Sequence, residues 1–109
     1  MANYRRIYGP AAATTGDTAI FTGVANFKYK IRSLIVCNTS ASSGTFNFAI
    51  NGTSATAANC LFNTQTVAGN TTSIFYPEAV TVGTQTINAL ASATSITFTV
   101  NAEEIPFTS

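Results

Sequence analysis

Residues 27–37 read FKYKIRSLIVC, the longest stretch in which apolar and polar side chains alternate. Alternation with a period of two residues is typical of a β-strand with one buried face and one wet face. The odd positions of this stretch are predicted to face a core. The even positions begin with Lys28, Lys30 and Arg32. The opposite face therefore starts as a ladder of positive charges spaced about 7 Å apart.

The second half of the same strand is predicted to be apolar on both faces. Leu34 and Val36 continue the side that bears the charged ladder, whereas Ile35 lies on the predicted core side. A strand with two apolar faces needs a cover on each of them. We therefore expect a loop, the N-terminal arm or a neighbouring subunit to cover Leu34 and Val36.

Seven further segments alternate in the same way, and Gly, Pro or Asn residues separate them. They span residues 4–8, 18–22, 45–51, 60–67, 72–76, 80–91 with a break at Gly83, and 95–102. No helical period of 3.6 residues persists, so the fold class is all-β. Eight strands predict a single antiparallel β-sandwich domain over residues 1–109, jelly-roll-like and not immunoglobulin-like. Residues 1–9 are expected to form a short N-terminal arm and residues 103–109 a C-terminal tail.

The composition indicates a protein that packs against other subunits. Only 8% of the residues are charged and the net charge is +1, whereas soluble domains carry about 25% charged residues. Little self-repulsion keeps copies of such a chain apart. We prefer an assembly subunit to a neutral secreted domain. No signal peptide and no run of roughly 20 apolar residues is visible, so we expect synthesis in the cytoplasm and no membrane contact.

The sequence offers no catalytic constellation. It contains no histidine, the usual base beside a serine or cysteine nucleophile. The carboxylates are Asp17, Glu78, Glu103 and Glu104. The two adjacent glutamates point to opposite sides of an extended chain, which makes them a poor pair for glycoside hydrolysis. We therefore expect no enzyme and no catalytic residue.

No metal or cofactor site is expected either. Cys37 and Cys60 without a histidine cannot complete a zinc site. Both cysteines lie in apolar segments and are interpreted as small buried side chains, although a disulfide between them stays open. Asp17 could bind calcium with backbone carbonyls, but an aspartate in such a loop more often stabilises a turn.

Three interpretations of the charged ladder stay open. It is a solvated strand face, a salt-bridge contact with the acidic residues Glu103 and Glu104 of the same or a neighbouring chain, or a site for phosphate, sulfate or sialic acid. Nucleic acid is not expected as a partner, because a net charge of +1 is far from the basic signature of such proteins.

Several segments resemble a group of small structural proteins of tailed bacteriophages. These segments are Tyr4 to Tyr8 with Gly9-Pro10, IFT at 20–22 with Val24, KIRSLIVCNTSASSGTFNFAING at 30–52, LF at 61–62, VAGNTTSI at 67–74 and SITFTVNAEE at 95–104. The resemblance implies a β-sandwich subunit carried in many copies on a virion. Its expected role is a capsid decoration (cement) protein, or a tail, neck or fibre component. It also implies a homotrimer or other symmetric oligomer that contacts a major capsid or tail protein.

The candidate interface residues fall into three groups. They are the cations and apolar residues on the predicted outer face of strand 27–37, the residues near the two chain ends, and the aromatic residues after residue 74. They are Tyr4, Arg5, Ile7, Tyr8, Lys28, Lys30, Arg32, Leu34, Val36, Phe75, Tyr76, Ile105 and Phe107. A rival hypothesis is a carbohydrate-binding module that contacts a host glycan through its tyrosines. A pilus or surface-layer subunit is a third hypothesis, and the absence of a visible export signal counts against it.

Overall fold

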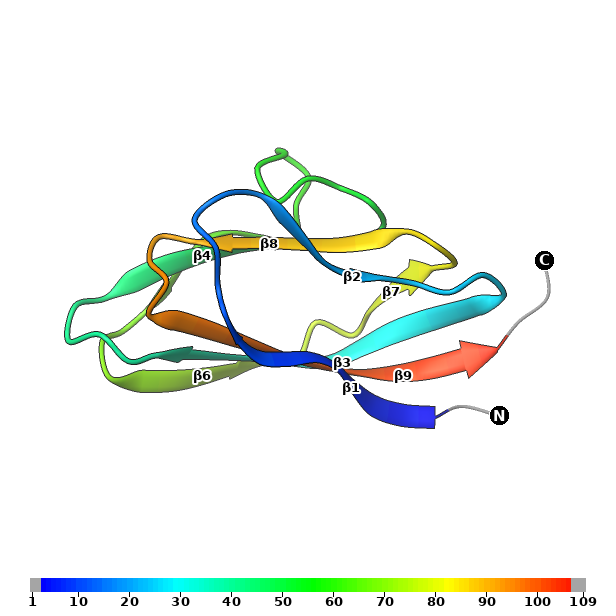
Figure 1. The fold of residues 1–109 in the computed structure, drawn as a ribbon, viewed down its shortest axis with the longest axis horizontal. Coiled ribbons are helices and arrows are strands. Elements are labelled where there is room, and N and C mark those ends of the chain that lie inside the picture. Colours follow the sequence, from blue (N-terminus) through cyan, green and yellow to red (C-terminus); the bar gives the residue numbers. More distant parts are fainter. Residues whose placement is uncertain (1–2, 107–109) are drawn as a thin grey trace.

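The computed structural model describes residues 3–106, and within them the chain forms antiparallel β-strands stacked in two layers (Figure 1). The strands are β1 (Asn3–Ala12), β2 (Thr18–Thr22), β3 (Phe27–Asn38), β4 (Gly44–Ala49), β5 (Phe62–Val67), β6 (Thr71–Phe75), β7 (Ala79–Val82), β8 (Thr86–Ala91) and β9 (Ile96–Pro106). The predicted all-β class and antiparallel β-sandwich are confirmed.

The strand order is that of a jelly roll. One sheet runs β1-β9-β3-β6, with β7 paired to the other half of the β3 edge, and the second sheet runs β2-β8-β4-β5. Without β7, the two orders correspond to the eight-stranded double Greek key. The additional strand arises because the predicted segment 80–91 divides at Gly83, whose φ of 61° is readily adopted by glycine. β7 then stays in the five-stranded sheet, and β8 crosses to the other one.

A β-bulge in β3 reverses which side chains face the core. The pairing of β3 with β9 shifts register between Ile31 and Ser33. A bulge inserts one extra residue, so every later side chain changes face. Leu34 and Val36 consequently point between the sheets and are 0% exposed. The prediction that they lie on the outer side and need a cover from another segment or subunit is wrong, and Ile35 takes the outer position instead.

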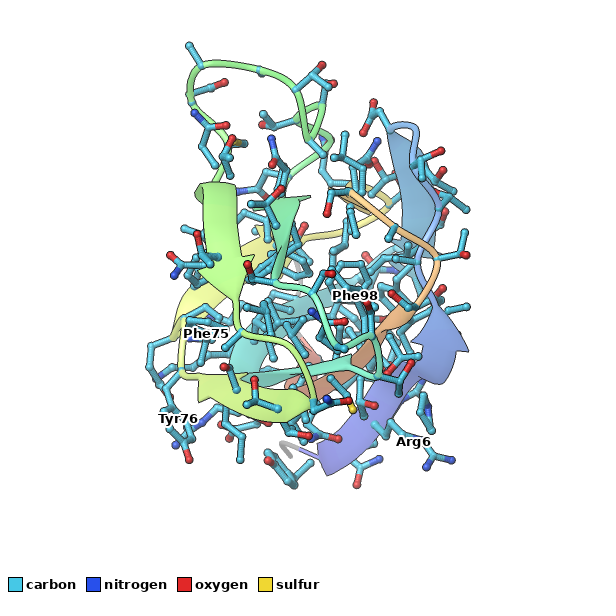
Figure 2. The ribbon with its side chains drawn as sticks, turned by 90° about the vertical axis from the view of Figure 1, so that its left-hand side faces the viewer. Arg6, Phe75, Tyr76 and Phe98 are labelled. Carbon is cyan, nitrogen blue, oxygen red and sulfur yellow. The ribbon has the colours of Figure 1, made fainter. Side chains whose placement is uncertain are left out.

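An aromatic cluster fills one end of the core. The ring of Phe46 lies between 5.4 and 5.7 Å, centroid to centroid, from the rings of Phe62, Phe75 and Phe98. Aromatic pairs at this spacing stabilise a core beyond the area they bury. Phe75 therefore packs inward and does not offer its ring to a partner, contrary to its assignment as an interface residue. Figure 2 shows Phe75 and Phe98 within the sandwich, whereas Tyr76 projects away from it.

Both predicted terminal extensions belong to the five-stranded sheet. β1 pairs with β9 and continues past Tyr8 to Ala12. Ile7 and Tyr8 pack against the core, so the region predicted as an N-terminal arm is an edge strand over the residues described. β9 runs to Pro106, which places most of the predicted tail in the sheet as well. Phe107 lies outside the described residues.

Candidate functional site

The charged residues gather on one sheet. Eight of the nine charged side chains belong to the five-stranded sheet or to the connection between β6 and β7: Arg5, Arg6, Lys28, Lys30, Arg32, Glu78, Glu103 and Glu104. The strands of the other sheet carry none, and Asp17 lies just before β2. The two outer faces of the sandwich therefore differ in chemistry, and a charged site can form on only one of them.

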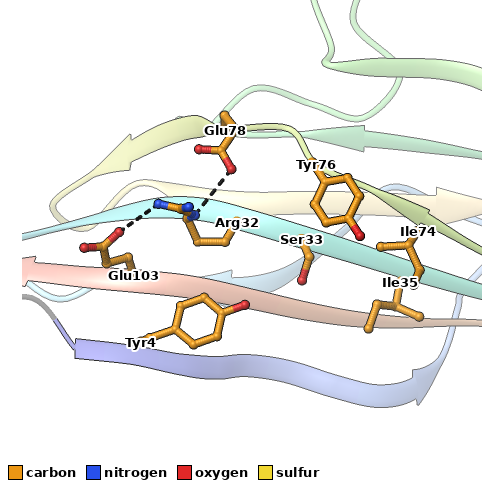
Figure 3. Close-up of a pocket in the computed structure, with 8 residues that line it drawn as sticks. All are labelled: Tyr4, Arg32, Ser33, Ile35, Ile74, Tyr76, Glu78 and Glu103. Atoms are coloured by element: carbon orange, nitrogen blue, oxygen red, sulfur yellow. Dashed lines mark hydrogen bonds and ion pairs between the residues drawn. The ribbon is translucent and has the colours of Figure 1, made fainter.

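Two of the three cations in the charged ladder of β3, Lys30 and Arg32, are paired with carboxylates of the same chain. The Arg32 guanidinium lies 3.3 Å from Glu78 Oε2 through its Nε and 3.1 Å from Glu103 Oε1 through its Nη1 (Figure 3). Lys30 Nζ lies 3.4 Å from the other oxygen of Glu78. Two cations thus face two carboxylates, and their formal charges cancel. Of the three interpretations of the ladder, the salt bridge with Glu103 of the same chain is observed.

A shallow groove of about 720 Å³ crosses this face next to the ion pairs. Tyr4 of β1 and Tyr76, which follows β6, lie on its two sides (Figure 3). Ser33, Ile35 and Ile74 complete the lining between the tyrosines and the ion pairs. The groove therefore combines two aromatic rings, two aliphatic side chains and a neutral set of charged groups.

The exposed apolar side chains concentrate on the sheet that bears the groove, and three of them line it. Among residues 3–106, seven large hydrophobic side chains are exposed, and five of them belong to the five-stranded sheet and its β6–β7 connection. These five are Tyr4, Ile74, Tyr76, Val80 and Val82, which we call the apolar strip. Val80 and Val82 pair with Lys30 and Lys28, so they share the outer face of the sheet. Scattered exposed apolar residues are normal, but a cluster indicates a contact surface.

The structure brings together only part of the predicted interface. Six of the thirteen candidates lie on or beside the outer face of the five-stranded sheet: Tyr4, Lys28, Lys30, Arg32, Tyr76 and Ile105. Arg5 lies 3.7 Å from Glu104 in a separate ion pair. The remaining described candidates lie in the core or against it, as given above.

Four residues of this surface were not among the candidate interface residues: Ile74, Glu78, Val80 and Val82. Ile74 stands in a continuous apolar run, although its position between inward-facing neighbours assigns it to the outer side. Glu78 has a φ of 54°, and its backbone N–H donates to the carbonyl of Ile31 at 2.9 Å. This bond fixes the connection that brings the carboxylate over the ladder. A side-chain pattern carries no signal for such a turn.

Two of the four tyrosines pack in the core or against it. Tyr29 is 0% exposed, and its hydroxyl accepts a hydrogen bond from the backbone N–H of Val24 at 3.3 Å. Burial, with the neighbouring Glu104, raises the pKa of the Tyr29 phenol. Tyr8 packs against the core. The exposed tyrosines are therefore Tyr4 and Tyr76, which flank the groove.

Asp17 anchors a long excursion on the opposite sheet. The chain between β4 and β5 rises above that sheet (Figure 1). The Asp17 carboxylate accepts hydrogen bonds from the backbone N–H of Ala55, the hydroxyl of Ser54 and the amide of Asn88 at 2.9 to 3.1 Å. These donors, the Ala55 N–H above all, lower the pKa of Asp17. The aspartate thus fixes a distant loop, a role that local sequence does not reveal.

The thiols and the remaining features show no further site. Cys37 and Cys60 are both free. Within residues 3–106, no three His, Cys, Asp or Glu side chains lie close enough to hold a metal ion. That same part of the chain has no helix with the length and apolar character to cross a membrane. No protein-family model and no curated protein matches this chain.

Proposed function

We propose that this jelly roll is a non-enzymatic structural subunit of a tailed-bacteriophage virion, a capsid decoration protein that adds contacts between subunits of the particle. The observation that supports the proposal is the concentration of the apolar strip on one sheet. The low overall charge and the resemblance of the sequence segments to small phage structural proteins agree with it. In this role the protein is made in the host cytoplasm and carried on the virion.

The chemistry of the strip suits a protein contact. Tyrosine and arginine are enriched where protein interfaces bury their centre, and lysine and glutamate are depleted there. Tyr4 and Tyr76 are 62% and 69% exposed, so both rings gain buried area on docking. The ion pairs around Arg32 are already satisfied, so a partner that covers them meets no net charge. A major capsid or tail protein that presents an uncharged surface fits this face.

The test measures attachment to the particle. Purified virions that lack the protein are mixed with wild type or with the double variant Ile74→Ser/Tyr76→Ser, and the bound fraction is measured after sedimentation. We expect the double variant to bind at least about tenfold more weakly, since burial of one large apolar side chain contributes more than about 1.4 kcal/mol. Val24→Ser is the matched control, because Val24 is 53% exposed on the β2–β3 loop. Equal binding of both variants, or no binding of wild type, contradicts the proposal.

A second candidate function is recognition of a neutral saccharide in the groove. Sugar rings stack on aromatic faces and take hydrogen bonds from charged and hydroxyl groups at their edges. Tyr4 and Tyr76 supply two rings, and Arg32, Glu78 and Glu103 supply donors and acceptors beside them. Because the formal charges of Lys30, Arg32 and these carboxylates cancel, a neutral glycan fits better than a sialylated or sulfated one.

A glycan array separates the two functions. Binding of neutral oligosaccharides by wild type, lost in Tyr76→Ala and kept in Val24→Ala, supports the carbohydrate site. Retention of an acidic glycan alone contradicts the proposed neutral ligand. Particle attachment without any glycan signal favours the decoration subunit.

A further inference from the structure

Each sheet of the sandwich has two edges, at which a strand lacks a neighbour on one side. These edges differ in what protects them from pairing with another chain. In the five-stranded sheet the edges are β1 on one side and β6 with β7 on the other; in the four-stranded sheet they are β2 and β5. An edge strand presents unpaired backbone N–H and C=O groups that can pair with another chain. Proteins prevent this pairing with charges, prolines, bulges or covering groups.

Three edges carry such devices within their own strand. β1 contains Arg5, Arg6 and Pro10, and its pairing with β9 shifts register twice. β2 has five residues and a register shift between Ala19 and Phe21. β5 has a register shift opposite β4 and a left-handed residue, Thr64, with a φ of 52°. None of these three strands offers a straight, regular ladder to a partner.

On the fourth edge, which β6 and β7 share, the β7 part is covered by one side chain. The Asn51 amide accepts a hydrogen bond from the backbone N–H of Val82 at 3.1 Å and donates one to the carbonyl of Val80 at 3.1 Å. A primary amide with one donor and one acceptor thus takes the place that a peptide group of a neighbouring strand would occupy. The backbone N–H of Asn51 also donates to Thr81 Oγ1 at 3.1 Å. The β7 edge is therefore satisfied within the chain.

The β6 edge is as short as β2 but lacks charges, prolines, register shifts and a covering side chain. Its register with β3 is regular over Thr71–Phe75, with no shift. The strand, TTSIF, contains no charged residue, no proline and no glycine. Within residues 3–106, no side chain forms a hydrogen bond with its backbone, and Pro77 stands only after its end. β6 is therefore the one described edge that is left ready for pairing.

We propose that β6 pairs antiparallel with β6 of a second copy of this chain, so that the five-stranded sheets of both copies join into one continuous sheet. The inference rests on the proposed function as a structural subunit and names the first partner in its assembly. A two-fold axis brings the same strand of both copies together, so lengths and side chains match by symmetry. Two TTSIF edges carry no charge, so nothing repels them.

The side chains next to this edge favour the same partner. Ile74 is 51% exposed on the outer face of β6. Antiparallel pairing places it next to the side chains on the outer face of β6 in the second copy. The apolar strips of the two copies then lie on the same face of the joined sheet. Together they form one longer apolar surface that can contact the particle. An extended segment of another protein could use the same backbone groups, and the experiment below distinguishes it.

The experiment measures the mass of the purified full chain by light scattering over a range of concentrations. Thr72→Lys adds a charge at an exposed position of β6, and Thr66→Lys adds the same charge at an exposed position of the β5 edge. Wild type and Thr66→Lys are expected to form dimers of the 11.4 kDa chain. Thr72→Lys is expected to raise the dimer dissociation constant at least about tenfold, because paired strands place like charges close together.

Amide hydrogen exchange of wild type gives an independent readout that needs no variant. Alternate N–H groups of Thr71–Phe75 are expected to exchange more slowly at high protein concentration, whereas the edges β2 and β5 show no change. A monomer at every concentration, or a dimer protected elsewhere or kept in Thr72→Lys, overturns the inference. Particle attachment is measured separately: a monomer that still binds virions through the apolar strip disproves β6 pairing and leaves the proposed function intact.

Discussion

The Asp17 carboxylate accepts a hydrogen bond from the backbone N–H of Ala55, 38 residues further along the chain, at 2.9 Å. This single acceptor organises the uncharged side of the molecule, because the same carboxylate also takes hydrogen bonds from Ser54 and Asn88. The two sheets of the sandwich thus use their few charges differently: one pairs Lys30 and Arg32 with Glu78 and Glu103, and the other uses a lone carboxylate to hold a loop.

Acid is expected to loosen this loop. The hydrogen bonds lower the pKa of Asp17 in the folded state below its ordinary value of 3.8. A carboxyl with a lowered pKa contributes its stabilisation above the unfolded value and loses it as the pH falls through the folded value. We expect the protection of the Ala55 amide, the ratio of the intrinsic exchange rate at the same pH to its observed rate, to decrease below pH 3.8 in wild type. Asp17→Asn should show low protection already at neutral pH and no step in this range. The same step in both proteins would contradict the assignment.

The β-bulge predicts unequal costs for two adjacent substitutions. Leu34→Ala removes a fully buried side chain from between the sheets and should lower the free energy of unfolding by about 2–5 kcal/mol. Ile35→Ala acts on the half-buried outer side and should cost about 1 kcal/mol or less. Urea denaturation of both variants measures the difference. A larger loss of unfolding free energy in Ile35→Ala than in Leu34→Ala would contradict the position of the bulge before Leu34.

The ion pairs on the outer face are expected to contribute little to stability. The side chains of Arg32 and Glu103 are 40% and 29% exposed, so water and salt screen their attraction. A double-mutant cycle with Arg32→Met and Glu103→Gln should give a coupling energy below about 1 kcal/mol that shrinks in high salt. A coupling above about 2 kcal/mol would mean that the pair acts as a structural anchor of the sheet.

The amide of Asn51 is expected to keep β7 from pairing with other chains. Asn51→Gly keeps a residue that tolerates the φ of 55° at this turn but removes both hydrogen bonds to β7. We expect a loss of about 1–2 kcal/mol in unfolding free energy and new, irregular self-association seen by light scattering. Asn59→Gly changes an exposed asparagine of the same β4–β5 connection; it is the control and should stay as soluble as wild type.

The sequence predicted the layers of this fold better than the orientation of its central strand. Alternation along 27–37 indicates a strand whichever way it faces, but an inserted residue at the bulge has no side-chain signature. The pattern still contains a trace of it: the core residues Tyr29 and Ile31 are odd-numbered, whereas Leu34 and Val36 are even-numbered. Interpreting this change of parity as a bulge, and not as a strand with two apolar faces, gives the observed core.

Only some residues of the candidate site were predictable from the sequence, and the surface that they form was not. Chemistry alone singles out Tyr4, Arg32 and Tyr76, and all three line the groove. Their meeting depends on β1 and β6 lying on opposite sides of the β9–β3 pair, which only the sheet order supplies. The contribution of Glu78 depends on a left-handed turn, and the cover of β7 by Asn51 depends on a contact 31 residues apart.

The antiparallel pairing of β1 with β9 also has a consequence for engineering. Asn3 stands opposite Glu104, so the two ends of the described chain emerge side by side at one pole of the sandwich (Figure 1). The gap between Asn3 and Glu104 is that of neighbouring strands, about 5 Å, and Pro106 lies only two residues beyond Glu104. A host protein could therefore accept residues 3–106 as an insertion in a single surface loop, and a circular permutant could join Asn3 to the end of β9 by a short linker and open at an exposed turn.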